Sequence, residues 1–288
     1  MALSVLLIVA YKIIGVFRIF NIVDKTLAIQ ETKDAWRKFA TEIKYFQNNT
    51  ITALKIVDDD LYVASTIKNG DSYLLKMYIY NMKNGFCSDV TSKLGLNDTA
   101  TITKLVYDHF KKQIWITTNG NGRLSDCYDL KINLIERYSD SYTKGPSREE
   151  PAYLDQDLSG ELKKIDRRSG EIFEYDDFWA VIGFYKGNAY IYSFKNKKLT
   201  LVYQPSWVYN WPMCGTLNRK RAFIGTGGYG LIIVDFEKME TKRVGTDDTN
   251  QVSIRALAAD DKYLWITSTV GLFKIEIDYL LKGVDTKK

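Results

Sequence analysis

Apolar and polar residues alternate with a period of two from about residue 42 to the end of the chain, a pattern typical of β-strands with one buried face. The best-formed stretch is 253–275, SIRALAADDKYLWITSTVGLFKI. Ile254 and Leu257 belong to a first short strand, two aspartates turn the chain, and a second strand surrounds Trp265. A glycine then starts a third strand. This stretch is predicted to be one unit of a repeat.

The unit recurs several times upstream. Its first half is repeated at 51–65 and 102–118, and more faintly at 214–231. Its second half is an alternating strand, a turn of Gly, Asn, Lys or Glu, and another strand, and it occurs at 74–90, 162–175, 189–203 and 231–244. A complete unit therefore has about 40 residues and four short strands.

Units of this kind predict an all-β fold, a single β-propeller, because one four-stranded sheet cannot bury both of its faces and needs neighbours around a ring. About six four-stranded blades are expected, and five is the alternative because the repeat is degenerate between 141 and 205. The expected second strands start near Leu61, Ile114, Ala152, Ala189, Ala222 and Leu264. The last unit lacks an outer strand, and residues 42–46 (EIKYF) are predicted to supply it and close the ring.

The segments outside the propeller, which is expected to span 42–282, have a different pattern. Residues 1–23 are almost wholly apolar and are predicted to form an N-terminal apolar helix, long enough to anchor the chain in a membrane. Lys12 in its middle keeps two alternatives open, a cleaved signal peptide and a helix packed on protein. Residues 24–41 predict an amphipathic linker helix, and 283–288 form a short basic tail.

The motifs I-x-x-L-x-x-D, L-[YW]-[VI]-x-[ST] and G-L occur at 51–65, 102–118 and 254–275, and less well at 214–235. They resemble the two-component-regulator propeller repeats of periplasmic bacterial sensors, which are related to WD40-like and quinoprotein-like propellers. The resemblance implies a domain that binds small ligands, often glycans, and passes a signal to a kinase through a membrane helix. Neither a kinase sequence nor a second apolar segment follows the propeller here, so the expectation is sensing or scaffolding rather than complete signalling.

Composition and charge exclude several classes of function. The sequence is 45% hydrophobic and 26% charged, which predicts a folded chain. Its net charge of +5 comes from basic residues scattered among 35 acids, so no nucleic-acid groove is expected. Cys87, Cys127 and Cys214 are too far apart for a zinc pattern and are predicted to be small buried hydrophobes. The single histidine, His109, cannot form a His-rich metal site.

One segment has the spacing of a calcium loop, with oxygen ligands at its first, third and fifth positions and a carboxylate at its twelfth. The candidate calcium ligands are Asp155, Asp157, Ser159 and Asp166. Lys163 occupies the ninth position, where an oxygen or a water is expected. The alternative is that this segment is a turn that enters a blade strand.

A second candidate site is the aromatic connection 204–213, QPSWVYNWPM. Trp207, Tyr209 and Trp211 could stack on sugar rings or on the side chains of a partner protein. The alternative is that they form one face of a buried strand, because most aromatic side chains are part of a core. Trp115 and Trp265, which lie within the repeat itself, are assigned to packing between blades.

The sequence favours a non-enzymatic propeller that acts as a ligand-binding or protein-binding sensor or scaffold, held at a membrane or in a complex by its N-terminal helix. Another protein or a small glycan-like ligand is the expected partner. The propeller is expected to be extracytoplasmic, or soluble or secreted if a signal peptide is cleaved. Two alternatives remain: a glycoside hydrolase that uses loop carboxylates such as Asp176 and Asp177, and an accessory subunit of a larger membrane assembly.

Overall fold

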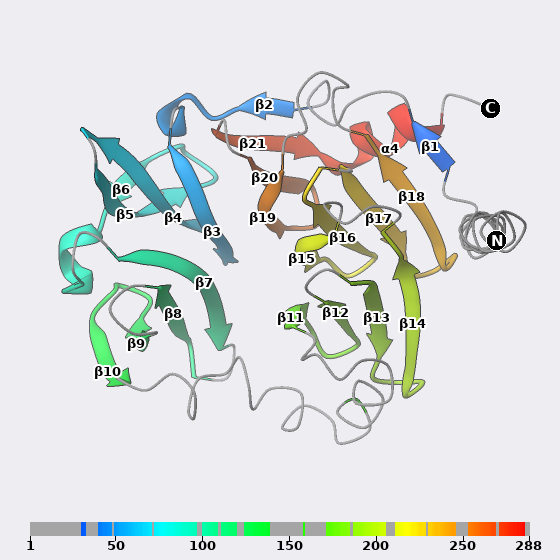
Figure 1. Cartoon of the computed structure of the whole chain (residues 1–288), viewed down its shortest axis with the longest axis horizontal. Helices are drawn as coiled ribbons and strands as arrows, with labels where there is room; N and C mark the ends of the chain where they lie inside the picture. The colour runs from blue at the N-terminus through cyan, green and yellow to red at the C-terminus, as the bar shows by residue number, and fades with distance from the viewer. Residues whose placement is uncertain are drawn as a thin grey trace, which may run out of the picture.

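The computed structural model is a ring of β-sheets arranged around a common axis (Figure 1). The residues that it describes are 30–32, 40–47, 49–70, 72–96, 100–108, 111–119, 124–138, 158, 171–184, 187–205, 211–228, 230–245, 253–268 and 271–285. The alternating pattern therefore does form strands, and the prediction of a β-propeller is confirmed.

Five blades lie within the described part of the chain, each with its strands in antiparallel order from this axis outwards. Blade 1 contains β3 (Thr50–Val57), β4 (Asp60–Asn69), β5 (Ser72–Asn81) and β6 (Cys87–Asp89). Blade 2 contains β7 (Thr101–Asp108), β8 (Gln113–Asn119), β9 (Leu124–Asp129) and β10 (Leu134–Tyr138). Blade 3 contains β11 (Glu171–Tyr175), β12 (Trp179–Gly183), β13 (Ala189–Ser193) and β14 (Lys198–Tyr203).

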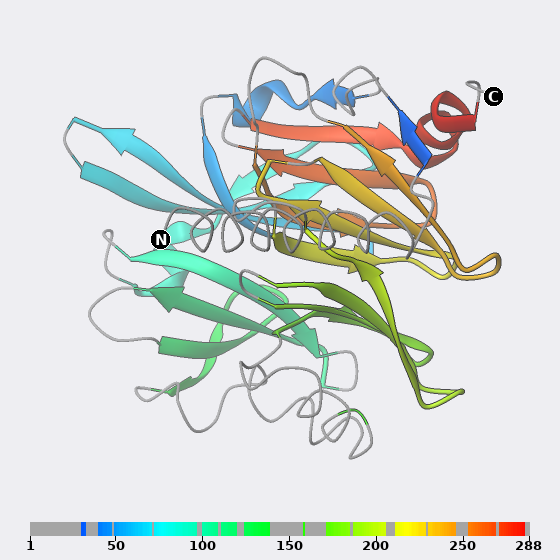
Figure 2. The same cartoon turned by 45° about the vertical axis from the view of Figure 1, so that its right-hand side comes forward.

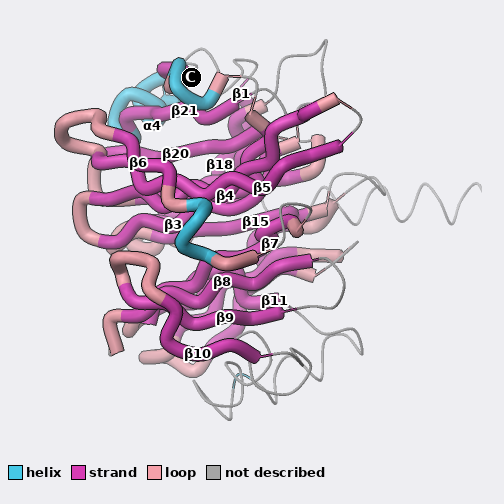
Figure 3. The backbone as a smooth tube through the Cα atoms, turned by 90° about the vertical axis from the view of Figure 1, so that its left-hand side faces the viewer, coloured by secondary structure: helices cyan, strands magenta, loops and turns pink. Residues whose placement is uncertain are grey.

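The last two blades each include a strand from the start of the chain. Blade 4 contains β15 (Pro212–Leu217), β16 (Arg221–Thr226), β17 (Leu231–Asp235) and β18 (Glu240–Val244), and β1 (Gln30–Thr32) adds to its outer edge in parallel. Blade 5 contains β19 (Ile254–Ala259), β20 (Tyr263–Ser268), β21 (Gly271–Glu276) and β2 (Ala40–Glu42). Figures 2 and 3 show the sheets packed face to face, with their connections at the two ends of the molecule.

The count of about six blades is wrong, and the described chain forms the five of the alternative. The error lies in blade 3, where Ala189 was expected to start a second strand and instead starts β13, the third. Residues 171–175, expected to end a hairpin, are the innermost strand. Two weak sequence units are thus one blade. Ala152, where another second strand was expected, lies outside the described residues.

The N-terminal strand does complete blade 5, but it lies slightly earlier than expected. Ala40 and Glu42 of β2 pair with Ile275 and Phe273 of β21, rather than the predicted 42–46. Residues Lys44–Phe46 form a short 3-10 helix, η2. This turn places Phe46 in the core between blades 5 and 1, where its side chain is fully buried.

The amphipathic helix predicted for 24–41 is wrong at 30–32 and at 40–41, because these residues pair with blade edges in β1 and β2. The predicted apolar helix 1–23 lies outside the described residues. At the other end, α4 (Ile277–Asp285) follows β21 directly and includes the first residues of the predicted tail. Its Ile277 and Leu280 are buried against the core of blades 4 and 5.

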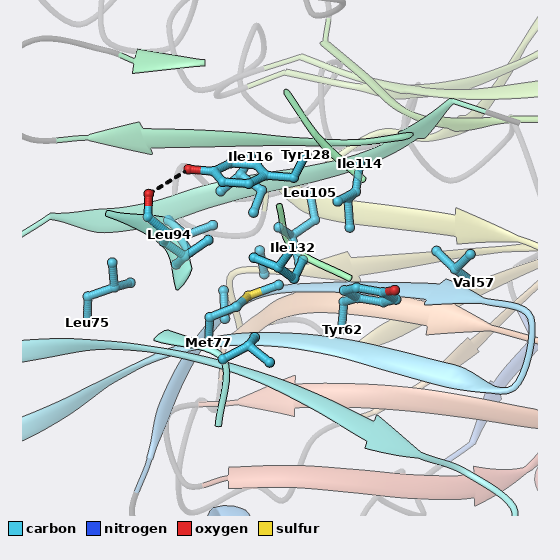
Figure 4. Packing of buried hydrophobic residues seen from close by; sticks show 14 residues of the cluster. Val57, Tyr62, Leu75, Met77, Leu94, Leu105, Ile114, Ile116, Tyr128 and Ile132 are labelled. Atoms are coloured by element: carbon cyan, nitrogen blue, oxygen red, sulfur yellow. Dashed lines mark hydrogen bonds between the residues drawn. The ribbon is translucent and has the colours of Figure 1, made fainter. Parts of the chain in front are cut away.

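Apolar side chains from facing blades form the core. Between blades 1 and 2, for example, Met77 packs with Ile114, Ile116 and Ile132 (Figure 4). The hydroxyl of Tyr128 donates a hydrogen bond of 3.0 Å to the Leu94 carbonyl at the edge of this cluster. Because each sheet supplies half of two such interfaces, no blade is expected to be stable alone.

The predicted aspartate turns hold the first two strands of several blades together. The Oδ1 atom of Asp260 accepts the backbone N–H groups of Lys262 and Tyr263, at 2.7 and 2.6 Å. Asp176 and Asn218 accept backbone N–H groups in the same way in blades 3 and 4. These turn residues are therefore structural.

Candidate binding site at the mouth of the central channel

Each of the five described innermost strands contains one β-bulge near its first residue. The register with the second strand shifts between Ile51 and Ala53 in β3, and at the equivalent place in the other four. The bulged residues are Thr52, Thr103, Phe173, Met213 and Arg255. All five line a single cavity, so the bulges lie at the same end of the channel, here called the upper mouth.

Local contacts fix several of these side chains. The Thr52 hydroxyl donates to the Ala64 carbonyl at 3.4 Å, and the Thr103 hydroxyl donates to the Thr117 carbonyl at 3.3 Å. The Phe173 ring lies close to Gly183, where a Cβ atom would collide with it. β-Bulges redirect side chains and occur often beside functional sites. The upper mouth is therefore an ordered ring of side chains rather than a frayed strand end.

The cavity at the upper mouth, the upper cavity, has a volume of about 90 Å³. Besides the bulged residues, its walls include Lys104, Glu174 and the small side chains of Ala53 and Ala256. A second cavity of about 320 Å³, the lower cavity, lies further along the strands. Glu174 lines both cavities, so its side chain lies at their boundary.

An ion pair marks this boundary. Lys55 Nζ lies 2.6 Å from each carboxylate oxygen of Glu174, and so joins blade 1 to blade 3 across the channel. The two side chains are only 11% and 22% exposed. A pair this sheltered is expected to hold the inner strands in position, because either charge alone would be poorly solvated.

Replacing Lys55 with alanine is expected to lower the free energy of unfolding by about 2–4 kcal/mol, because Glu174 would lose both charge-assisted contacts while it remains partly buried. Lys83→Ala is the matched control. Lys83 also pairs at 2.6 Å, with Asp59, but the two side chains are 73% and 53% exposed, and about 1 kcal/mol or less is expected. Denaturant unfolding measures both values. Equal losses in the two variants would show that the channel pair has no special role.

The predicted aromatic site is only partly described. Trp207 and Tyr209 lie outside the described residues, and Trp211 is half-buried just ahead of β15. Its carbonyl accepts the backbone N–H of Gly227 at 3.1 Å. Because Trp211 lies two residues before Met213, the aromatic connection enters the ring at the upper mouth.

The four predicted calcium ligands, Asp155, Asp157, Ser159 and Asp166, lie outside the described residues, so the calcium site stays a prediction. Within the part of the chain that is described, no group of three His, Cys, Asp or Glu side chains could hold a metal. The three cysteines have no disulfide partner. Burial raises the pKa of Cys87 and Cys127 to about 11, which keeps both thiols protonated near neutral pH.

The ring of bulged residues was not predicted, although the sequence contains a signal for it. In the motif I-x-x-L, two buried apolar residues are three apart, as in Ile51 and Leu54 or Ile254 and Leu257. A regular strand would place such residues on opposite faces. The extra residue is the bulge, and the position after each isoleucine is the one that lines the channel.

Fold and site together define a five-bladed β-propeller whose channel has one mouth lined by bulged residues. No protein-family model matches the chain, and no curated protein sequence matches it. Among solved structures, a chain in the crystal structure of the mitotic checkpoint complex has a TM-score of 0.51 over 82% of this chain and 93% of its own length, with 9% sequence identity. This similarity shows the fold alone.

Two structures of the extracellular domain of BT4673 from B. thetaiotaomicron also match. The first structure is named as the extracellular domain of a putative one-component system, and the second as that of a putative hybrid two-component system. Both matches cover 78% of this chain with a TM-score of 0.33, at 14% and 15% identity, and the chain spans 27% of their length. A hybrid two-component sensor is also the class of protein that the repeat motifs resemble, but a TM-score of 0.33 does not bear on function.

Proposed function

We propose that this propeller is a non-enzymatic binding module of a sensor or scaffold, and that its ligand or partner binds at the upper mouth. The observation that carries the proposal is the convergence of the five bulged residues on one cavity. They combine two hydroxyls, two apolar side chains and one guanidinium, a mixture suited to recognition. The expected partner remains another protein or a small glycan-like ligand.

The contacts of the channel carboxylates favour binding over hydrolysis. A glycosidase needs two carboxyl groups free to act as acid and as base or nucleophile. Lys55 engages both oxygens of Glu174, and Asp176 accepts the backbone N–H groups of Phe178 and Trp179, both at 2.7 Å. Asp260 accepts backbone N–H groups in the same way, so three of the four described carboxylates that line the channel are engaged in structural contacts.

Methyl NMR of protein labelled at its methionines would test the proposal. Met213 lies in the upper mouth and is 40% exposed, whereas Met239 is 42% exposed in the turn between β17 and β18. A screen of soluble glycans and small metabolites is expected to yield ligands that shift Met213 and leave Met239 unchanged. Ligands that shift only Met239, or glycan products that accumulate with time, would contradict the proposal.

Tethering by residues 1–23, with the propeller extracytoplasmic, is a separate part of the proposal and is supported by the length of that apolar segment. None of the helices in the described chain is long and apolar enough to cross a membrane. Carbonate extraction of membranes from cells that express the full chain provides the test. Retention in the membrane fraction is expected, and full release would overturn tethering while leaving the binding proposal intact.

A further inference from the structure

The two cavities of the channel differ in charge. Among the described residues, the charged side chains that line the upper cavity are Lys104 and Arg255 against Glu174, a net charge of +1. The lower cavity is lined by Lys55 and Arg219 against Glu174, Asp176, Asp260 and Asp261, a net charge of −2. Channel walls of one sign concentrate ligands of the opposite sign. The upper cavity therefore favours anions, and the lower one disfavours them.

The ion pair at the boundary increases this difference. Glu174 is the single acidic side chain that lines the upper cavity, and both of its oxygens lie 2.6 Å from Lys55 Nζ. The negative charge of Glu174 is thus largely compensated by Lys55, which lines the lower cavity. Lys104 donates to the Ile172 carbonyl at 3.3 Å and adds positive charge to the same wall. An anion that enters the upper cavity therefore meets the guanidinium of Arg255, and the one described carboxylate in the wall is engaged by Lys55.

Arg255 is the group able to bind such an anion directly. It is the bulged residue of β19, its side chain is exposed, and the described residues provide no ion-pair partner for it. A guanidinium presents two parallel N–H donors that match the two oxygens of a carboxylate. Met213 on the neighbouring blade 4 and the edge of the Phe173 ring on blade 3 also line the cavity and add apolar surface to its wall.

The size of the upper cavity limits the ligand. Its volume of about 90 Å³ has room for about three groups the size of a water molecule, at about 30 Å³ each, so a ligand larger than this extends out of the mouth. We infer that the upper cavity binds a small organic carboxylate, with the carboxylate on Arg255 and a compact apolar body against Met213 and Phe173. This inference rests on the proposal that the upper mouth is the ligand site, and it adds the chemical class of the ligand.

Benzoate and its neutral counterpart benzamide, which have nearly the same shape, are suitable probes. In methionine methyl NMR, benzoate is expected to shift Met213 in a saturable way and to leave Met239 unchanged. Benzamide is expected to bind at least about tenfold more weakly, because it cannot form a charge-assisted pair with Arg255.

Two matched variants locate the anion site. Arg255→Gln is expected to weaken benzoate binding at least about tenfold, whereas Arg219→Gln, at an exposed residue of the lower cavity, should leave it within about twofold. Equal binding of benzoate and benzamide, or unchanged benzoate binding by Arg255→Gln, would overturn the carboxylate inference and leave the upper mouth as a site for neutral ligands. If no compound of any charge shifts Met213, the proposed function fails as well.

Discussion

Deleting residues 40–47 is expected to abolish cooperative folding of the propeller. These residues supply β2, the outer strand of blade 5, and their loss would leave the edge of β21 unpaired. They also supply Phe46, which is fully buried between blades 5 and 1. Removing a buried phenylalanine side chain alone costs about 3–5 kcal/mol, a large part of a typical domain stability of about 5–15 kcal/mol. Circular dichroism on heating provides the measurement.

Single substitutions at two neighbouring residues show whether the loss comes from the buried core of the closed ring or from any change in this segment. Phe46→Ala is expected to lower the free energy of unfolding by about 3–5 kcal/mol. Tyr45→Ala should cost about 1 kcal/mol or less, because Tyr45 is 54% exposed and its ring meets those of Phe46 and Tyr78 edge-on. An unchanged melting temperature after deletion of 40–47 would refute closure by this strand.

Trp265→Ala is expected to destabilise the protein by about 3–5 kcal/mol. Trp265 is the largest of the fully buried described side chains, and it packs in the core between blades 5 and 1 with Leu54 and Leu61. Its ring meets that of Tyr80 edge-on at 5.9 Å. The alanine variant would leave a cavity where two blades meet. Denaturant unfolding at equilibrium measures the loss through the transition midpoint.

Trp265→Phe distinguishes lost packing from a lost polar contact. The indole Nε1 is buried, and no hydrogen-bond partner lies within reach in the described chain. Phenylalanine would therefore remove an unsatisfied donor and part of the volume, and a smaller loss than that of alanine is expected. Phe86→Ala, at a side chain that is 67% exposed, should change stability by about 0.5 kcal/mol or less. A loss below about 1 kcal/mol for Trp265→Ala would contradict its role in blade packing.

The blade architecture was predictable because it depends on local spacing. Apolar residues at every second position identify strands, and aspartates between them identify turns, so 51–65, 102–118 and 254–275 could be aligned without any structure. Trp265, assigned to blade packing, is fully buried, while Trp115, given the same role, is half-buried. The local repeat therefore predicted the fold class correctly, but it did not predict how deeply each tryptophan is buried.

The blade count and the first strands were less predictable, since both depend on contacts between distant parts of the chain. Residues 30–32 and 40–42 have the composition of a helix, yet the free edges of β18 and β21 bind them as strands. An unpaired sheet edge offers a row of backbone hydrogen-bond partners that outweighs a weak helical preference. The alternation at 42–46 predicts a strand close to β2, but no local pattern predicts the strand at 30–32.

The candidate site, like the blade count, depends on contacts between distant parts of the chain. The sequence pointed to a calcium loop and to the aromatic connection 204–213, whereas the site that we propose lies on bulges within the repeat itself. Arg255 occupies a variable position of a motif whose neighbours are structural. Ring closure brings Arg255 to the same cavity as Phe173 and Met213, which lie 82 and 42 positions earlier in the chain.

The sequence by itself determined that this protein is a β-propeller of short four-stranded units, that an N-terminal strand completes the last of them, and that aspartates turn its hairpins. These features follow from periodicity and turn chemistry, which act over a few residues. Only the tertiary structure decided that there are five blades, that five bulges meet at one mouth, and that positive charge gathers there above the pair of Lys55 and Glu174. Those features arise from ring closure, which brings together side chains that no local pattern relates.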